Sequence, residues 1–299
     1  MHDAIVGSAV YKENERKVCE EMKKRILTAA VCVPLAVAVL SFCPVWVTRL
    51  AVAFFCCVGM LEMLSALKLN HHRLLTAVAV VFAAVVPSLD QLGGTTAILT
   101  AVAIYALLLT VVQLLFNQTL KVERLMFFGT ASVMTIVPLG MLAHLCAIPD
   151  HGRFYIYFAL IIAWLADIGA YFVGTFLGKH KLCPNISPKK TVEGLIGGLI
   201  SAALFSMVGA WVYQLVALDA LGLQINFWAV ALTAMVLSPL SVIGDLICSV
   251  IKRQTGIKDF GNLFPGHGGV LDRFDSLIFV APLLYVATMF IPFVSSAYL

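Results

Sequence analysis

The chain is dominated by long runs of apolar residues that short polar segments separate. A helix rises 1.5 Å per residue, so about 20 apolar residues cross the hydrocarbon core of a bilayer. Unpaired strand edges cannot persist in lipid, and we therefore read all of these runs as helices. The pattern predicts an all-α, polytopic integral membrane protein with about nine transmembrane helices. The predicted spans are residues 26–43, 46–67, 74–89, 96–116, 125–148, 154–177, 193–217, 226–251 and 276–295.

Lysine and arginine are distributed unevenly between the polar segments. With these spans, Arg49 and Arg153 fall on one side of the membrane and every other Lys and Arg falls on the opposite side. The positive-inside rule places the basic side in the cytoplasm, so we expect a cytoplasmic N-terminus and an external C-terminus. The net charge of +4 therefore reflects membrane topology and does not indicate nucleic-acid binding.

The distribution of polar residues divides the chain into three regions. Residues 1–25 are polar and mixed in charge, and we interpret them as a cytoplasmic N-terminal tail or an interfacial helix. Residues 26–148 form a five-helix N-terminal membrane region with one conspicuous carboxyl group, that of Glu62. Its role is open between pairing with a neighbouring helix and lining a polar cavity. Residues 149–299 form a four-helix membrane region that we expect to be the catalytic one.

Residues 249–275, SVIKRQTGIKDFGNLFPGHGGVLDRFD, are unusually polar for a chain that is 12% charged and 61% hydrophobic. Ionisable groups resist transfer into lipid, so their concentration beside a span indicates a functional site. Basic residues suit phosphate, and aspartates suit a hard divalent cation. Glycines allow backbone N–H groups to approach a polyphosphate closely. The residues are Lys252, Arg253, Lys258, Arg273, Asp259, Asp272, Asp275, Gly266, Gly268 and Gly269.

Polar residues also lie inside two of the predicted spans. Asp245, Ser249 and Lys252 follow one another at i, i+4 and i+7, which places them on one face of the eighth span. Asp245 lies about 10 Å of helix rise below Lys252, so it needs a cation or a hydrogen-bond donor. Asp167 lies well inside the sixth span. We expect both aspartates to form the floor of a polar cavity, with a salt bridge that has no catalytic role as the alternative for Asp245.

A basic loop at residues 178–191 precedes the seventh span. Ser187 and Pro188 predict a helix N-cap followed by proline at the first helical position. Such a helix start would direct its N–H groups, with Lys189 and Lys190, at an anion. The alternative for the two lysines is that they are only the positive charges of the cytoplasmic side.

Residues 249–275 resemble the phosphatidate cytidylyltransferase motif at every defined position, and residues 169–194 also resemble that family. The two blocks lie in the C-terminal half, whereas the first five spans agree with the family only in hydrophobicity and number. Ile168 and Thr175 depart from the family pattern, which leaves secondary phosphate contacts open.

The resemblance implies the reaction CTP + phosphatidate → CDP-diacylglycerol + pyrophosphate in phospholipid biosynthesis, with Mg²⁺ as cofactor. A second, monovalent ion such as K⁺ is left open. A phosphate oxygen of phosphatidate attacks the α-phosphorus of CTP, and because it is already anionic it needs positioning and charge neutralisation more than a base. The expected partners are CTP, phosphatidate and membrane lipids, with no nucleic acid and with a homodimer left open. The expected location is the cytoplasmic membrane of a bacterium, with the active site facing the cytoplasm.

The resemblance and the chemistry of the side chains together assign a role to each site residue. Asp245 and Asp272 are the predicted metal ligands. The predicted catalytic residues are Asp245, Asp272, Lys252, Arg253, His267 and Arg273. The predicted substrate-binding residues are Asp167, Ser187, Lys189, Lys190, Thr191, Ser249, Lys258, Asp259, Gly266, Gly268 and Gly269.

Two other functions compete with this one. A CTP-dependent polyprenol kinase has a similar nucleotide-binding region but transfers the γ-phosphoryl group and releases CDP, and the full motif through Asp275 favours the cytidylyltransferase. A membrane transporter would also carry acids inside its spans. Paired broken helices in repeated halves are typical of transporters, and the motif-bearing segments here occur once each.

Overall fold

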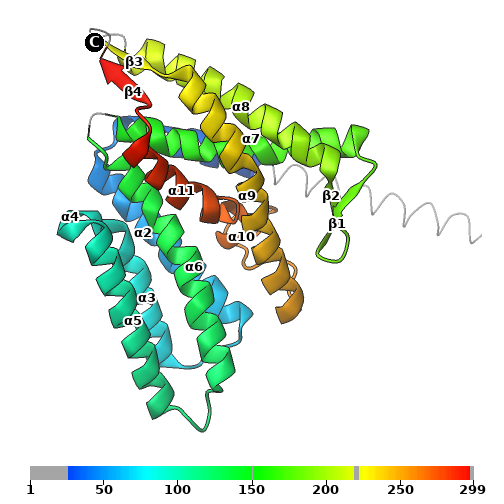
Figure 1. Cartoon of the computed structure of the whole chain (residues 1–299). Helices are drawn as coiled ribbons and strands as arrows, with labels where there is room; N and C mark the ends of the chain where they lie inside the picture. Colours follow the sequence, from blue (N-terminus) through cyan, green and yellow to red (C-terminus); the bar gives the residue numbers. More distant parts are fainter. Residues whose placement is uncertain (1–25, 150, 219–221, 297–299) are drawn as a thin grey trace, which may run out of the picture.

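The computed structural model describes residues 26–149, 151–218 and 222–296, and long apolar helices make up most of it (Figure 1). Six of the described helices are long and apolar enough to cross a membrane. They are α2 (Val45–Ala66), α5 (Thr95–Leu115), α6 (Val122–Cys146), α7 (Gly152–Leu177), α8 (Val192–Tyr213) and α9 (Phe227–Thr255). The prediction of an all-α, polytopic membrane protein is confirmed. The predicted tail at residues 1–25 lies outside the described residues.

Three shorter apolar helices complete the set that the sequence predicts. They are Ile26–Phe42, α3 (Arg73–Val85) with the 3₁₀ turn η1 (Val86–Ser88), and α11 (Leu277–Phe290). The last helix ends before the predicted span does, because Pro292 has no N–H group to continue it. Each predicted span overlaps one of these helices, whereas the number of membrane crossings and the side of the N-terminus stay predictions.

Two small antiparallel sheets interrupt the helical pattern. Strands β1 (Lys181–Cys183) and β2 (Ser187–Thr191) form a hairpin between α7 and α8. Strands β3 (Leu223–Ile225) and β4 (Val294–Ser296) pair beside the start of α9. The remaining short elements are α4 (Asp90–Gly93), the π-helical turn η2 (Gln214–Leu218) and α10 (Leu271–Phe274).

The helix start predicted at Ser187 and Pro188 is wrong. Ser187 pairs with Cys183 in the hairpin, so the chain is extended through Pro188. Helix α8 begins at Val192, and its N-cap is Thr191, whose Oγ1 accepts a hydrogen bond from Gly194 N at 3.1 Å. A strand suits this segment because the residue before a proline is biased toward extended backbone, and the missing N–H group of proline is tolerated in a two-stranded sheet, where each strand has a free edge.

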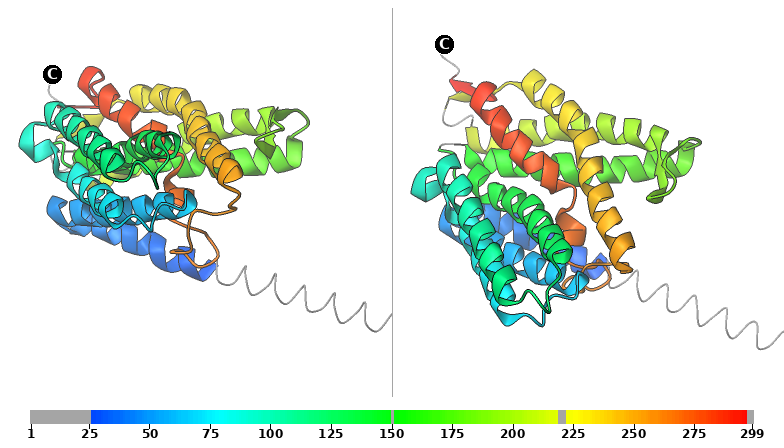
Figure 2. Two further views of the ribbon diagram at one scale, coloured as in Figure 1. Left: turned by 90° about the horizontal axis from the view of Figure 1, so that it is seen from below. Right: turned by 60° about the horizontal axis from the view of Figure 1, so that its bottom comes forward.

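Helices α7 and α8 lie side by side and carry the β1–β2 hairpin at their far end (Figures 1 and 2). Glycines allow the close approach: a side chain at Gly197 would overlap Val173 of α7, and one at Gly169 would overlap Ser201 of α8. Helix α9 packs on α8, and α11 packs against α6, α7 and α9. The buried core includes residues of α2, α3, α5, α6, α7, α9 and α11, together with Ile251, Phe260 and Leu271 of segment 249–275.

Candidate active site

Four aspartates from separate elements gather in a largely buried cluster. Asp167 comes from the middle of α7, Asp245 from α9 and Asp272 from α10, and Asp275 follows α10 directly. Ser276 Oγ donates a hydrogen bond to Asp167 Oδ2 at 2.6 Å, which joins α7 to the start of α11. The cluster thus contains both aspartates that the sequence places inside predicted spans.

The carboxyl groups of Asp245 and Asp275 lie close enough to share a hydrogen bond when one of them is protonated. Helix α9 can approach the Asp275 turn because Gly244 has no side chain, since a Cβ atom there would overlap the Asp275 carbonyl group. Burial, and then the neighbouring Asp245 carboxyl group, raise the pKa of Asp275 well above its usual range. Two acids so close together favour either a shared proton or a bound cation.

Lys190 reaches this cluster from β2. Its Nζ atom forms an ion pair with Asp245 Oδ2. The hairpin is held on α8 by Glu193, whose carboxylate accepts hydrogen bonds from the backbone N–H of His180 and from His180 Nδ1 at 2.6 Å. Side chains alternate along a strand, so Lys189 is exposed whereas Lys190 is half-buried. The hairpin therefore directs one of the two predicted phosphate ligands into the site.

Asp272 is the most constrained carboxylate of the group, with 7% of its surface exposed. Its Oδ1 atom accepts a hydrogen bond from Lys252 Nζ at 2.9 Å. Its Oδ2 atom accepts hydrogen bonds from Phe260 N at 2.7 Å and from Gly269 N at 3.0 Å. Three donors therefore fix the position of Asp272 in this structure, and the ammonium group of Lys252 neutralises its charge.

The glycine-rich segment forms a tight turn over Asp272. Gly266 and Gly268 have φ angles of 75° and 88°, which are readily accessible only to glycine. Phe264 and Gly268 form an isolated antiparallel bridge that closes the turn. The N–H group of Gly269 donates to Asp272, so a role for this glycine in binding phosphate stays a prediction.

The remaining predicted site residues differ in their exposure to solvent. The Arg273 backbone is fixed by Trp164, whose Nε1 atom donates to the Arg273 carbonyl oxygen at 3.1 Å. Ser187, Ser249 and His267 are half-buried. The exposed residues are Lys189, Arg253, Lys258, Asp259, Gly266 and Arg273. The cluster therefore has a floor of buried and half-buried carboxylates, and the Lys and Arg residues of segment 249–275 other than Lys252 are exposed.

Three residues that contact the site have no catalytic, substrate-binding or metal-binding role in the prediction from sequence: Asp275, Ser276 and Glu62. Asp275 stands in the motif, but its partnership with Asp245 depends on how α9 packs on the turn after α10. Ser276 fixes Asp167. Glu62 accepts hydrogen bonds from the N–H groups of Val270 and Leu271, so its carboxylate pairs with the backbone at the start of α10, whereas a role in lining a polar cavity stays a prediction. A carboxyl group in an apolar helix was the one signal that pointed to Glu62.

The donor chemistry of the cluster fits a hard cation that shares its coordination with phosphates. No three His, Cys, Asp or Glu side chains in residues 26–149, 151–218 and 222–296 are arranged to hold a metal by themselves. Mg²⁺ in nucleotide-binding sites takes one or two carboxylates and completes its shell with phosphates and water. Asp245 and Asp272 are the two carboxylates that the sequence predicts for such a site, and Asp275 lies beside Asp245.

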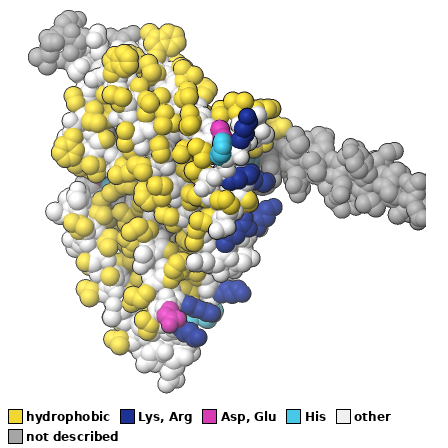
Figure 3. All heavy atoms as spheres, turned by 45° about the vertical axis from the view of Figure 1, so that its right-hand side comes forward, with side chains coloured by type: hydrophobic (Ala, Val, Ile, Leu, Met, Phe, Trp, Pro, Cys, Tyr) yellow, Lys and Arg dark blue, Asp and Glu magenta, His cyan; other side chains and the backbone are white. Residues whose placement is uncertain are grey.

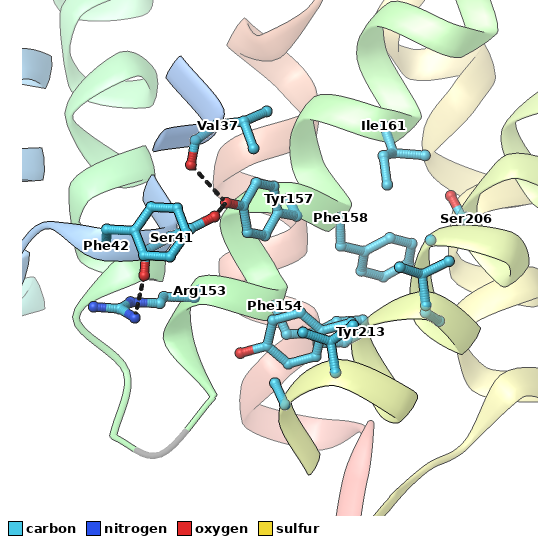
Figure 4. A pocket seen from close by; sticks show the side chains of 15 residues that line it. Val37, Ser41, Phe42, Arg153, Phe154, Tyr157, Phe158, Ile161, Ser206 and Tyr213 are labelled. Carbon is cyan, nitrogen blue, oxygen red and sulfur yellow. Dashed lines mark hydrogen bonds between the residues drawn. The ribbon is translucent and has the colours of Figure 1, made fainter. Parts of the chain in front are cut away.

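A separate apolar cavity of about 530 Å³ lies between the Ile26–Phe42 helix, α7 and α8 (Figure 4). It is lined by aromatic and aliphatic side chains such as Phe154 and Tyr213, together with Arg153 and the buried Ser206. Arg153 donates hydrogen bonds to the carbonyl oxygens of Ser41 and Cys43. None of the predicted site residues lines this cavity.

Comparison with known proteins agrees with the resemblance seen in the sequence. The sequence model of the cytidylyltransferase family matches residues 23–291. A phosphatidate cytidylyltransferase of Bacillus subtilis (strain 168) is 42% identical over 180 residues, which cover 58% of this chain and 64% of that protein. One of Staphylococcus haemolyticus (strain JCSC1435) is 40% identical over 175 residues, with the same two coverages. The matched region is therefore less than two thirds of the length of these relatives.

Proposed function

This chain belongs to the cytidylyltransferase family, and we propose that it transfers the cytidylyl group of CTP to phosphatidate, forming CDP-diacylglycerol and pyrophosphate. The observation that carries the proposal is the cluster of Asp167, Asp245, Asp272 and Asp275 with Lys190 and Lys252, built from segments that resemble the family motif. Relatives over 40% identical in part of their length are named phosphatidate cytidylyltransferase.

The reaction joins two anions, so the protein must position them and neutralise their charge. Lys190 and Lys252 lie against the carboxylate floor, and each ammonium group can turn toward a phosphate. Arg253, Lys258 and Arg273 are exposed to the solvent from which CTP arrives. The phosphate of phosphatidate is the nucleophile, and these basic groups hold it in line with the α-phosphorus.

Asp245 and Asp272 are our proposed Mg²⁺ ligands, with Asp275 beside Asp245. When bound, Mg²⁺ supplies charge neutralisation at the phosphates and a template for the two substrates. The hydrogen bonds of Asp272 to Phe260 N and Gly269 N keep its carboxylate oriented for this role. Ser276 orients Asp167 at the edge of the same floor.

We also propose that the site faces the cytoplasm of a bacterial cell membrane. In Figure 3 the Lys and Arg side chains of the visible face gather along one side, whereas the rest of that face is largely hydrophobic. The positive-inside rule assigns such a side to the cytoplasm, where CTP is available. Phosphatidate would present its headgroup at the same membrane surface.

The test uses the purified full chain in detergent with phosphatidate, Mg²⁺ and CTP that carries a radioactive label on either its α- or its γ-phosphate. The products that contain the label are then identified. Cytidylyl transfer moves label from the α-phosphate into the lipid fraction and releases γ-label as pyrophosphate. A polyprenol kinase would instead move γ-label into a polyprenol lipid and release CDP. Absence of α-label in lipid, with folded protein and both substrates present, contradicts the proposal.

A further inference from the structure

We propose that Glu62 is a positioning residue that sets the shape of the signature loop, defined as residues 260–271, and this rests on the proposed cytidylyltransferase function. Glu62 belongs to α2 in the N-terminal membrane region and is 8% exposed. Its Oε1 atom accepts a hydrogen bond from Val270 N at 2.9 Å, and its Oε2 atom accepts one from Leu271 N at 3.0 Å. Both N–H groups directly precede Asp272, so Glu62 fixes the backbone that carries this carboxylate.

Two glycines of the loop make room for the Glu62 carboxylate. A Cβ atom at Gly261 would overlap Glu62 Oε1, and one at Gly269 would overlap both of its oxygens. The carboxylate therefore occupies the space that a side chain at either position would need. This contact gives Gly261 and Gly269 a reason to be glycine that does not require a bound polyphosphate.

A continuous face of α2 supports the same loop. Phe55, Gly59 and Glu62 follow at i, i+4 and i+7, which places them on one side of the helix. The Phe55 ring lies 6.3 Å from the Phe264 ring, centroid to centroid. A Cβ atom at Gly59 would lie 3.1 Å from the Leu271 side chain, so the loop approaches the backbone of α2 closely. The N-terminal membrane region thus packs against the signature loop through α2.

Glu62 and Asp272 hold the loop from two sides. Asp272 accepts hydrogen bonds from Phe260 N and Gly269 N, and Glu62 accepts them from the next two N–H groups, of Val270 and Leu271. Buried N–H groups that lose such acceptors are costly, so loss of one carboxylate loosens the arrangement that the other maintains. Because Lys252 binds Asp272, a displaced loop also displaces the ammonium group proposed to meet substrate phosphate.

The first test combines kinetics with hydrogen exchange on the full-length protein in detergent. Glu62→Gln keeps the size of the side chain but turns an NH₂ group toward one of the two loop N–H donors. We expect residues 260–272 to exchange at least tenfold faster while the other helices are unchanged. We expect kcat to fall at least tenfold with a smaller change in the KM for CTP. Glu123→Gln, which changes an exposed carboxylate at the start of α6, is the matched control and should match wild type.

The second test asks whether Gly269 has to be glycine in order to leave room for the Glu62 carboxylate. In the wild-type background, Gly269→Ala should lower kcat/KM at least tenfold. In a Glu62→Asp background, the shorter carboxylate side chain leaves room for the methyl group. There, adding Gly269→Ala should lower kcat/KM less than threefold relative to Glu62→Asp alone. An equal loss in both backgrounds overturns the proposal. The proposal is also overturned if the Glu62→Gln protein is less heat-stable but shows wild-type hydrogen exchange in the signature loop and a wild-type kcat. Glu62 would then have only a structural role. If wild type itself makes no CDP-diacylglycerol, the proposed function fails, whereas the exchange measurement still tests the contact.

Discussion

Lys252 Nζ lies 2.9 Å from Asp272 Oδ1, and the ion pair joins the cytoplasmic end predicted for α9 to the short helix α10. Their side chains are 16% and 2% exposed, so water screens the pair only weakly. The pair holds a positive charge close to Asp245 and Asp275. It also ties together two of the residues that the sequence predicts to be catalytic.

Replacing Lys252 should impair turnover, because it removes a positive charge from the proposed site, and it should also destabilise the fold, because it leaves the buried Asp272 carboxylate without its ionic partner. A charge-assisted hydrogen bond is worth about 1.5–3 kcal/mol, so Lys252→Met should lower kcat/KM by roughly ten- to a hundredfold. Lys252→Arg keeps the charge and should lose less. Steady-state rates of CDP-diacylglycerol formation measure both effects. Lys121→Met, at an exposed position before α6, is the control, and equal rates for it and Lys252→Met would contradict the assignment.

The hairpin gives Lys189 and Lys190 different surroundings, and their variants should differ accordingly. Lys190 forms an ion pair with Asp245, whereas Lys189 is exposed. We expect Lys190→Ala to lower kcat/KM for CTP by roughly ten- to a hundredfold and Lys189→Ala to lower it by severalfold at most. If both variants stay within about twofold of wild type and the membrane content of the protein is unchanged, the two lysines are only inside-positive charges.

The dependence of the rate on Mg²⁺ should identify the carboxylates that hold the metal. Chelation by EDTA should abolish turnover, and Mg²⁺ should restore it. Asp245→Asn and Asp272→Asn should each remain inactive at saturating Mg²⁺, because a two-carboxylate site loses one of its charges. Asp275→Asn should keep some activity and need at least severalfold more Mg²⁺ for half of its maximal rate. Near-normal activity of Asp245→Asn or Asp272→Asn would remove that residue from the proposed ligands.

The sequence predicts the membrane helices well because each follows from local hydrophobicity. The segment from Ser187 to Thr191 shows where local reasoning fails. Ser187 and Pro188 are a good helix start by themselves, but pairing with residues 181–183 makes them a strand and moves the N-cap to Thr191. A hairpin depends on two segments at once, so the preference of one of them does not decide it.

Within the site, the sequence identifies ionisable residues more readily than their partners. Lys190 and Asp245 were both predicted to bind ligands, but their ion pair depends on the tertiary structure, because β2 packs against α7 and α8 and Lys190 reaches Asp245 of α9 from there. Glu62 shows the limit most clearly, since 208 residues separate it from Val270. Its depth in an apolar helix indicates that it needs a partner, whereas only the packing of α2 identifies that partner.

The N-cap of α8 offers a test of stability that does not depend on catalysis. Thr191 Oγ1 accepts a hydrogen bond from Gly194 N, and loss of such a cap typically costs about 1 kcal/mol. Thr191→Ala should therefore lower the thermal midpoint of the detergent-solubilised protein by a few degrees. Thr191→Ser keeps the hydroxyl group and should be close to wild type. Equal midpoints for the alanine and serine variants would show that the cap contributes little.

The orientation of the site can be tested at the two ends of α5. Gln91 lies in α4 and Asn117 follows the end of α5, and both are exposed. The 21 residues of α5 span about 31 Å, enough to cross the hydrocarbon core. The distribution of Lys and Arg predicts Gln91 outside and Asn117 in the cytoplasm. In a cysteine-free background, an impermeant maleimide should label Gln91→Cys on intact cells and Asn117→Cys only after lysis. The reverse pattern would place the aspartate cluster on the outer side, away from cytoplasmic CTP, and would contradict both the topology and the proposed location of the reaction.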